Sequence, residues 1–441
     1  MAKEKIAMIS LGCAKNLVSS EQMLCLLDDA GYELTSGFDG ADAVIINTCG
    51  FIDSAKSEAI DNILEMAELK KEGRLGKIIV AGCMAERYRS EILTEMPEVD
   101  AVVGVGSYAE ICGVLRRTLD GERVERYGDK NAPVDEVGRF VTTGPAWAYL
   151  KIAEGCDNRC AYCAIPDIRG RFRSRPMENI VAEATALAQS GVRELIVIAQ
   201  DITRYGTDLY GERRLAELCR ELADIDGVEW IRLHYLYPDE IDGALIDEIA
   251  NNGKIVKYLD IPIQHINTGI LRRMNRRGTG EEIRGLFGEL RRRIPGLVLR
   301  TSLITGLPGE GEAEFEELCD FLREARIERA GVFPYSPEEG TPAAEMPDRC
   351  TPEEAQRRAE LIMELQAGIM DDYCASCIGK SLRILCTGEE GGYMTGRSYA
   401  DSPDIDGTVY FEGDCEPGEF AEVLITGVMD GELVGKIAEE N

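Results

Sequence analysis

Short apolar stretches alternate with longer amphipathic ones from residue 5 to about residue 374, and this alternation is the strongest constraint on the fold. Short runs of β-branched and aliphatic residues predict buried strands, and the amphipathic stretches between them predict helices. Strands that alternate with helices favour a parallel sheet with helices on both faces. We therefore predict an α/β protein, divided into more than one domain because 441 residues exceed the size of a single ordinary core.

Residues 1–120 are expected to form a Rossmann-like parallel α/β domain. The predicted strands are 5–11, 43–47, 77–81 and 101–104, and helices are predicted at 54–69 and 108–119. Residues 121–146 are polar and contain two prolines and four glycines, which predicts a linker.

Residues 147–377 repeat the same rhythm at a longer spacing. The predicted strands are 148–153, 194–199, 230–235, 258–263, 297–304 and 330–335. Six strand–helix units predict a (β/α)6 partial TIM barrel, because a full eight-stranded barrel would need more chain. A charged helix near 352–374 is expected to close this domain.

Residues 378–441 change character: they form short strand patterns separated by glycine turns, which predicts a small antiparallel β-barrel. This tail carries 4 Lys or Arg against 14 Asp or Glu, a net charge of −10, and the whole chain has a net charge of −31. Such charge disfavours a polyanion as partner and suits a basic one, although acidity that only aids solubility is an equal alternative.

The first residues lack the apolar core of a signal peptide, and no apolar stretch approaches the roughly 20 residues of a membrane span. We therefore expect a cytoplasmic protein without membrane contact. Fifteen cysteines in a reducing compartment are unsuited to a disulfide framework, so groups of them are better interpreted as metal ligands and the others as small buried residues.

One group of cysteines, Cys156, Cys160 and Cys163, has the spacing C-x-x-x-C-x-x-C directly after a predicted strand. Thiolates hold iron–sulfur clusters, and such short spacings let one loop surround one cluster. Three cysteines leave one iron of a four-iron cubane open to an outside ligand. A structural zinc site would need a fourth Cys or His, and none is near, so a zinc loop or chance spacing is the weaker alternative.

A second group, Cys13, Cys49 and Cys83, is dispersed in sequence, but each cysteine follows an apolar strand and precedes a helix. The carboxyl ends of parallel strands share one edge of the sheet, and helix N-termini there favour the negative charge of thiolates. We expect the three to hold a second incomplete cluster. Three unrelated buried cysteines would not explain the shared position.

The C-x-x-x-C-x-x-C loop resembles the radical-SAM superfamily, whose open iron binds the amino and carboxylate groups of S-adenosylmethionine. The resemblance implies that Tyr162 lies against the adenine of this cofactor. It also implies cofactor contacts from Gln200, Gln264 and Gly306, each at the end of a predicted barrel strand. Polar residues are also common at strand ends without a function, so for these three positions the two interpretations are equally weighted.

Both cysteine groups together resemble the methylthiotransferase family over nearly the whole chain. The segments that carry the resemblance are Ser10-Leu-Gly-Cys-Ala-Lys-Asn-Leu-Val, Asn47-Thr-Cys-Gly-Phe-Ile-Asp-Ser-Ala-Lys, Tyr258-Leu-Asp-Ile-Pro-Ile-Gln-His, Tyr335-Ser-Pro-Glu-Glu-Gly-Thr and Gly396-Arg-Ser-Tyr-Ala-Asp. The resemblance implies two 4Fe-4S clusters, S-adenosylmethionine as cofactor, and a C-terminal domain of the TRAM type. It implies no catalytic side chain, because the clusters and the cofactor carry the chemistry.

The match is closer to the branch of this family that methylthiolates the β-carbon of an aspartate in ribosomal protein uS12. The alternative is the branch that modifies an adenosine of transfer RNA, and a non-catalytic adaptor is a further one. The acidic tail favours a basic protein over RNA, so direct nucleic-acid binding is not expected, and Asp401, Asp404 and Asp406 are expected to attract the partner. Arginine clusters at 169–175, 272–277 and 291–293 fit either RNA contacts or salt-bridged helix faces. We also expect an electron donor of the flavodoxin type.

Overall fold

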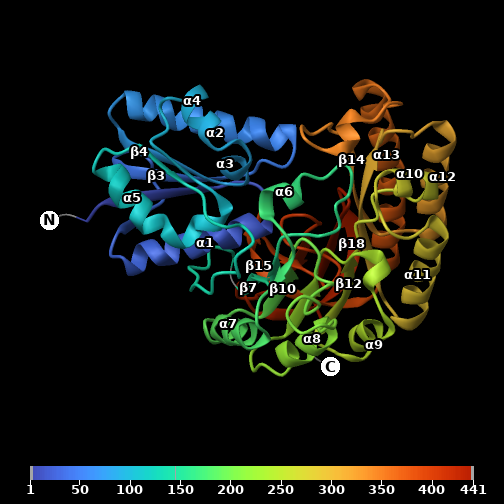
Figure 1. The fold of residues 1–441 in the computed structure, drawn as a ribbon. Helices are drawn as coiled ribbons and strands as arrows, with labels where there is room; N and C mark the ends of the chain where they lie inside the picture. Colours follow the sequence, from blue (N-terminus) through green and yellow to red (C-terminus); the bar gives the residue numbers. More distant parts are fainter. Residues whose placement is uncertain (1–2, 145, 439–441) are drawn as a thin grey trace. The chain divides into compact units, whose positions relative to one another are not determined.

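The computed structural model describes residues 3–144 and 146–438 (Figure 1). By internal packing the chain forms two compact units. The first comprises Met1–Thr142, Lys151–Asn179 and Ser336–Ala344, and the second comprises Thr143–Leu150, Ile180–Tyr335 and Glu345–Asn441. The domain bounds at residues 120, 146 and 377 stay predictions. The two compact units do not follow these bounds, because two segments of the predicted barrel domain pack with the N-terminal sheet.

The first unit contains a six-stranded parallel sheet in the order β2-β1-β3-β4-β5-β6. Its strands are β1 (Lys5–Ser10), β2 (Glu33–Thr35), β3 (Ala41–Thr48), β4 (Leu75–Gly82), β5 (Ala101–Val103) and β6 (Val124–Arg126). The four predicted strands are confirmed. The sequence prediction missed the edge strands β2 and β6, and β6 lies within residues 121–146, which were predicted as a linker.

Helices cover both faces of this sheet (Figure 1). They are α1 (Ala14–Asp29), α2 (Asp53–Lys71), α3 (Cys83–Tyr88), α4 (Ser90–Glu95), η1 (Val105–Glu110) and α5 (Ile111–Leu119). The helices α2, α3 and α4 pack on one face, and α1 and α5 on the other. Because both faces are buried, the central strands are almost continuously aliphatic, as in Val44-Ile-Ile and Ile78-Ile-Val.

The second unit contains a six-stranded open sheet in the order β14-β13-β12-β11-β10-β7. Its strands are β7 (Trp147–Lys151), β10 (Glu194–Ile198), β11 (Trp230–Leu233), β12 (Ile255–Asp260), β13 (Val298–Thr305) and β14 (Arg329–Pro334). Strands β10 to β14 pair in parallel and in chain order. The predicted six-stranded partial barrel is confirmed.

Amphipathic helices follow the strands of this sheet. They are α7 (Met177–Gln189), α8 (Leu215–Ala223), η2 (Pro238–Glu240), α9 (Gly243–Asn251), α10 (Thr268–Arg273), α11 (Gly280–Arg293), α12 (Glu312–Ala325) and α13 (Pro352–Cys377). Local signals set their ends: Thr279 and Glu282 form a capping box at α11, and Thr351 caps α13 ahead of Pro352. In the described part of the chain, no helix combines the length and apolarity needed to cross a membrane.

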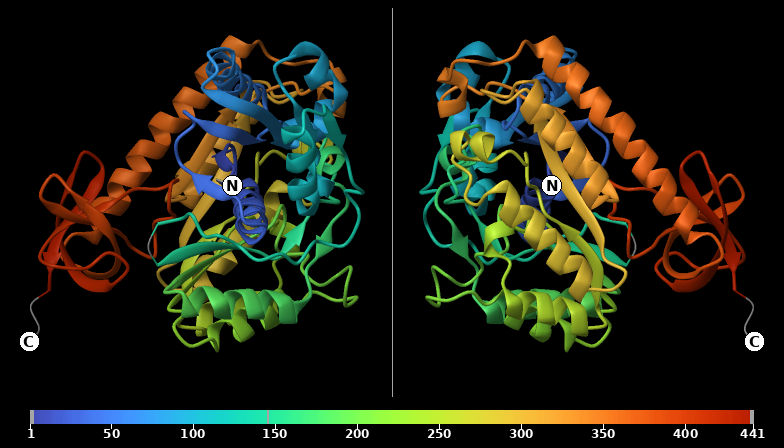
Figure 2. Two further views of the ribbon diagram at one scale, coloured as in Figure 1. Left: turned by 90° about the vertical axis from the view of Figure 1, so that its left-hand side faces the viewer. Right: turned by 90° about the vertical axis from the view of Figure 1, so that its right-hand side faces the viewer.

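A small closed barrel ends the chain, and Figure 2 shows it beyond the C-terminal end of α13. Its strands are β15 (Ser381–Glu390), β16 (Tyr393–Arg397), β17 (Val409–Glu412), β18 (Phe420–Met429) and β19 (Glu432–Ile437). Val409, Phe411 and Val423 are among the residues that form its core. The predicted barrel is confirmed, but β17 and β19 pair in parallel, so it is not wholly antiparallel.

Buried ion pairs attach the small barrel to the large sheet. Glu194 of β10 is fully buried and accepts hydrogen bonds from Arg232 Nε at 2.7 Å and Arg397 Nη2 at 2.6 Å. Burial opposes the charge of this carboxylate, but the two arginines outweigh it and hold the pKa of Glu194 below its usual value. Arg232 also donates to the carbonyl oxygen of Tyr399. A single carboxylate thus joins a strand of the sheet to a strand of the small barrel.

The loop between β16 and β17 supplies two more buried carboxylates. Asp401 accepts a hydrogen bond from Arg329 Nη2 at 2.7 Å, and Asp406 accepts one from the Tyr258 hydroxyl at 2.6 Å. The expectation that Asp401 and Asp406 are exposed docking charges is therefore wrong, because each is buried against a partner. Asp404 is exposed as expected.

Replacing Asp401 by Asn should lower the free energy of unfolding of the second unit by about 3 kcal/mol, because the buried Arg329 would lose its hydrogen-bonded counter-charge and keep only Asp406, 3.9 Å from its Nε. Asp404→Asn is the matched control and should change it by less than about 0.5 kcal/mol. Urea-induced unfolding followed by circular dichroism measures both. Equal stability of the two variants would contradict this role for Asp401.

Candidate metal centre and cofactor site

The cysteines of the first unit stand at the carboxyl edge of its sheet, one after each of three adjacent strands. Cys13 precedes α1, Cys49 lies between β3 and α2, and Cys83 is the first residue of α3. Gly12 has a φ of 89°, and a Cβ there would lie 2.7 Å from Cys49 Cβ and 3.2 Å from Cys49 Sγ. Only glycine allows this close approach. The fold thus brings the Cys13 and Cys49 loops into contact.

Electrostatic coupling shows that these three thiols share one environment. Burial and the neighbouring Cys83 raise the pKa of Cys49 to about 11, and burial raises the pKa of Cys83. At Cys13 burial acts in the same direction, but Lys15, Arg169 and backbone N–H groups outweigh it and lower the pKa. Cys13 and Cys83 oppose ionisation of Cys49, and Cys13 opposes that of Cys83. The irons of a bound cluster would favour the thiolate form of all three.

The positively charged guanidinium of Arg169 lies among these cysteines. Its side chain is 2% exposed, and its Nε and Nη2 lie 3.3 and 3.2 Å from Cys83 Sγ. The guanidinium also donates to Glu154 Oε2 at 3.2 Å and to Asn16 Oδ1 at 3.0 Å. The sequence analysis placed Arg169 only in an arginine cluster and missed this role. Its position six residues after Cys163 was the available signal.

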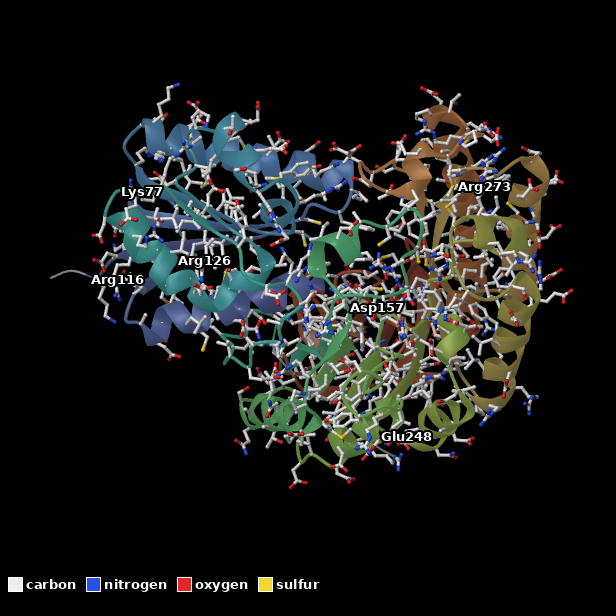
Figure 3. All side chains as sticks on the ribbon, in the orientation of Figure 1. Lys77, Arg116, Arg126, Asp157, Glu248 and Arg273 are labelled. Carbon is white, nitrogen blue, oxygen red and sulfur yellow. The ribbon has the colours of Figure 1, made fainter. Side chains whose placement is uncertain are left out.

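Cys156, Cys160 and Cys163 lie in the loop between β8 (Ala153–Glu154) and α6 (Ile165–Arg169), and β8 pairs with β9 (Arg173–Ser174). Hydrogen bonds fold the loop back on itself: Cys163 N donates to Cys160 O, and Cys156 N to Gly170 O. Asp157, labelled in Figure 3, accepts a hydrogen bond from Phe172 N at 3.2 Å.

The two cysteine groups belong to the same compact unit. Cys83 packs against Ala164, which follows Cys163 directly. The segment Ser336–Ala344 joins them further, because Ala343 N donates to Ala161 O at 2.9 Å within the cysteine loop. This packing brings the second group close to the first, which the sequence spacing alone did not indicate.

Glu338 is the buried anchor of that segment in the first unit. Its carboxylate accepts hydrogen bonds from Asp53 N, Lys56 Nζ and Arg87 Nη1 at 3.1, 3.0 and 2.9 Å. Arg87 also donates to Gly50 O, next to Cys49. The sequence analysis used this segment only as a mark of resemblance, and its structural role was missed.

Within residues 3–144 and 146–438, no three His, Cys, Asp or Glu side chains converge on a point where a single ion would bind. A cubane cluster is larger than an ion, so its ligands surround it and need not converge. All fifteen cysteines fall in these ranges and are free thiols. The fit of the two groups to clusters rests on their thiolate donors, their strand-end positions and the cations beside Cys13 and Cys83.

The residues expected to contact S-adenosylmethionine are divided between the units. Tyr162 is half-buried in the first unit. In the second unit, Gln200, Gln264 and Gly306 follow β10, β12 and β13 at the carboxyl ends of these strands. Gln264 has a φ of 69° and pairs with Leu303, so its backbone is fixed against β13.

The turn at Gly306 is held by a buried carboxylate. Gly306 has a φ of 77°, and its N–H donates to Glu310 Oε1 at 2.9 Å. Glu310 also accepts from Arg358 Nη1 at 2.9 Å and lies 3.3 Å from His265 Nε2. Burial would raise the pKa of Glu310, but His265, the Gly306 N–H and Arg358 together lower it. The carboxylate therefore favours its ionised form and holds the turn through the Gly306 N–H.

Three protein-family descriptions match successive parts of the chain. Residues 5–104 match "Uncharacterized protein family UPF0004", residues 150–322 match the radical SAM superfamily, and residues 378–438 match a TRAM domain. Among solved structures, the radical S-adenosylmethionine methyltransferase TsrM from Kitasatospora setae has a TM-score of 0.56 and 13% identity, covering 89% of this chain and 81% of that one. That likeness concerns the fold alone.

Curated relatives match from end to end. The ribosomal protein uS12 methylthiotransferase RimO of Acetivibrio thermocellus is 50% identical over 457 residues, which cover 100% of this chain and 99% of the relative. The RimO protein of Lachnoclostridium phytofermentans is 50% identical over 436 residues, which cover 98% and 99%. With the radical SAM and TRAM matches, this identity shows that the chain belongs to the RimO family of radical-SAM methylthiotransferases.

Proposed function

We propose that this protein adds a methylthio group to the β-carbon of an aspartate in ribosomal protein uS12. The observation that carries the proposal is the packing of two cysteine triads, each one ligand short of a cubane, into one compact unit. Full-length identity to proteins named for this reaction supports the same substrate. Because ribosomal proteins are made in the cytoplasm, we place the reaction there.

We propose two 4Fe-4S clusters and S-adenosylmethionine as cofactors, with one cluster held by Cys156, Cys160 and Cys163 and the other by Cys13, Cys49 and Cys83. When bound, they supply the 5′-deoxyadenosyl radical and the methylthio sulfur. An unactivated C–H bond yields to no general base, so the side chains of this protein bind, orient and exclude water.

The positioning roles of the protein are divided among a few residues. Tyr162 would present its ring to the adenine of S-adenosylmethionine. Gln200, Gln264 and Gly306 would offer polar atoms and a close backbone approach to the same cofactor. Glu310 would keep the Gly306 turn in its left-handed conformation through the bond to the Gly306 N–H. All of these roles concern binding and orientation.

The charges of the chain support a basic protein as substrate. Some arginines of the clusters considered for RNA contact are paired with carboxylates: Arg277 with Asp239 and Glu240, Arg291 with Glu328. Arg293 pairs with Asp247 and Glu289. A site for RNA phosphates would need such cations turned outward. We propose uS12 in place of transfer RNA, and a flavodoxin-type protein as the electron donor.

Anaerobically reconstituted protein supplied with S-adenosylmethionine and a reductant should convert uS12 to a product with one methylthio group in place of a hydrogen. Peptide mass spectrometry should place the group on an aspartate. Transfer RNA in a parallel reaction should remain unmodified. A methylthio adduct on adenosine, with none on the ribosomal protein, would instead support the transfer RNA branch of the family.

The full chain should bind about eight irons per molecule after reconstitution, because each proposed cluster holds four. Replacing Cys156, Cys160 and Cys163 by Ala should leave about four, and so should replacing Cys13, Cys49 and Cys83. Cys25→Ala with Cys112→Ala is the matched control in the first unit and should keep all eight. Full iron content in either triple variant would show that those cysteines hold no cluster.

The two triple variants should also differ in chemistry. Loss of Cys156, Cys160 and Cys163 should abolish formation of 5′-deoxyadenosine, because no open iron remains for the cofactor. Loss of Cys13, Cys49 and Cys83 should retain part of this cleavage while abolishing methylthio transfer. Liquid chromatography of the quenched reaction measures the nucleoside. The reverse pattern would exchange the two assignments.

A further inference from the structure

Arg169 donates two hydrogen bonds to one sulfur atom, and this distinguishes it from Arg87, another largely buried arginine of the first unit. Two N–H groups of one guanidinium point at Cys83 Sγ, at 3.3 and 3.2 Å. Arg87, in the same unit, is directed instead at the oxygen atoms of Gly50, Glu338 and Glu339. Arg169 thus places a fixed positive charge at a sulfur that the proposed second cluster would use.

The surroundings of Arg169 leave part of this charge for the sulfur. Glu154 Oε2 is shared, because it accepts from Lys151 Nζ at 3.0 Å and from Arg169 Nη1 at 3.2 Å. The other described contacts of the two cations are to neutral groups, Asn16 Oδ1 and Ser19 Oγ, and to Cys83. All of these side chains are buried. A buried cation that shares its counter-charge is costly unless another anion is present, and a ligated thiolate is such an anion.

The orientation of the guanidinium is fixed from both sides. Asn16 accepts from Arg169 and at the same time donates to Leu11 O at 2.7 Å, in the loop that leads to Cys13. Arg169 is the last residue of α6, whose C-cap Gly170 has a φ of 76°. The guanidinium therefore cannot turn away from Cys83 without breaking contacts to Asn16 and Glu154.

We propose that Arg169 is a positioning residue that raises the reduction potential of the second cluster through two N–H···S bonds to Cys83, and that Glu154 opposes it. Hydrogen bonds to ligand sulfurs and the net local charge set the potentials of iron–sulfur clusters. A positive charge at the sulfur favours the reduced cluster, which carries one more negative charge. The inference rests on the second cluster of the proposed function.

The test is a redox titration of the reconstituted full-length protein with dithionite and mediators, followed by electron paramagnetic resonance. The variant that lacks Cys156, Cys160 and Cys163 identifies the signal of the second cluster. Arg169→Met should lower the midpoint potential enough to change the ratio of reduced to oxidised cluster at least tenfold, about 59 mV for one electron. Arg169→Lys should lower it less, because it keeps the charge and loses the fork.

Two further variants separate electrostatics from stability. Glu154→Gln keeps the shape of the side chain and removes the opposing charge, so it should raise the midpoint potential. Lys70→Met removes an ion pair with Asp100 at the amino edge of the same sheet, away from the cysteines, and should leave the potential unchanged. A purely structural role of Arg169 would not move the potential in opposite directions for Arg169 and Glu154.

An unchanged potential in Arg169→Met, or shifts of the same sign in Arg169→Met and Glu154→Gln, would overturn the proposal. If Arg169→Met fails to bind four irons at this triad, the midpoint potentials of Arg169→Lys and Glu154→Gln are compared instead. Shifts of the same sign in these two variants would overturn the proposal. The iron content of the unaltered protein tests the second cluster itself. Failure of the proposed function is thereby distinguished from failure of this inference.

Discussion

Parallel pairing of β1, β3 and β4 is the constraint on which the candidate metal centre depends. Parallel strands end on one edge of a sheet, so cysteines placed after each strand meet there although they are dispersed in sequence. Two glycines allow the loops to approach closely. Gly12 leaves room for the Cys49 side chain, and Gly82, with a φ of 98°, forms the turn between β4 and Cys83. The meeting of the three cysteine loops is thus a consequence of the sheet topology and of glycine at two of the turns.

Buried charge is used in two different ways in the two units. In the second unit Glu194 meets two arginines and Asp401 meets Arg329, so carboxylates and guanidinium groups satisfy one another and attach the small barrel to the large sheet. In the first unit Lys151 and Arg169 share Glu154, and the guanidinium also faces a thiol. Ion pairs between partners of opposite charge stabilise an arrangement, whereas a cation beside a thiol would favour the anionic cluster proposed there.

Sequence patterns were sufficient for the elements that bury long apolar runs. They predicted ten strands of the two large sheets, the small C-terminal barrel and the strand-end positions of both cysteine groups, because local periodicity and connectivity determine these. They missed β2 and β6, since three residues at a sheet edge carry too little pattern. They also misplaced Asp401 and Asp406, because an acidic glycine-containing turn looks like surface until its arginine partners, distant in sequence, are known.

The same reasoning explains why domain bounds drawn along the sequence do not follow the packing. The cysteine loop belongs by connectivity to the partial barrel, yet Arg169 contacts Asn16 of α1 and Cys83 of α3 in the N-terminal region. Glu338 follows the last barrel strand, yet its carboxylate holds the start of α2 and Arg87 of α3. A fragment that ended at residue 146 would keep Cys13, Cys49 and Cys83 but lose both contacts. The proposed second cluster site therefore draws on three separate chain segments, and its charge environment is set by residues that no strand of its own sheet supplies.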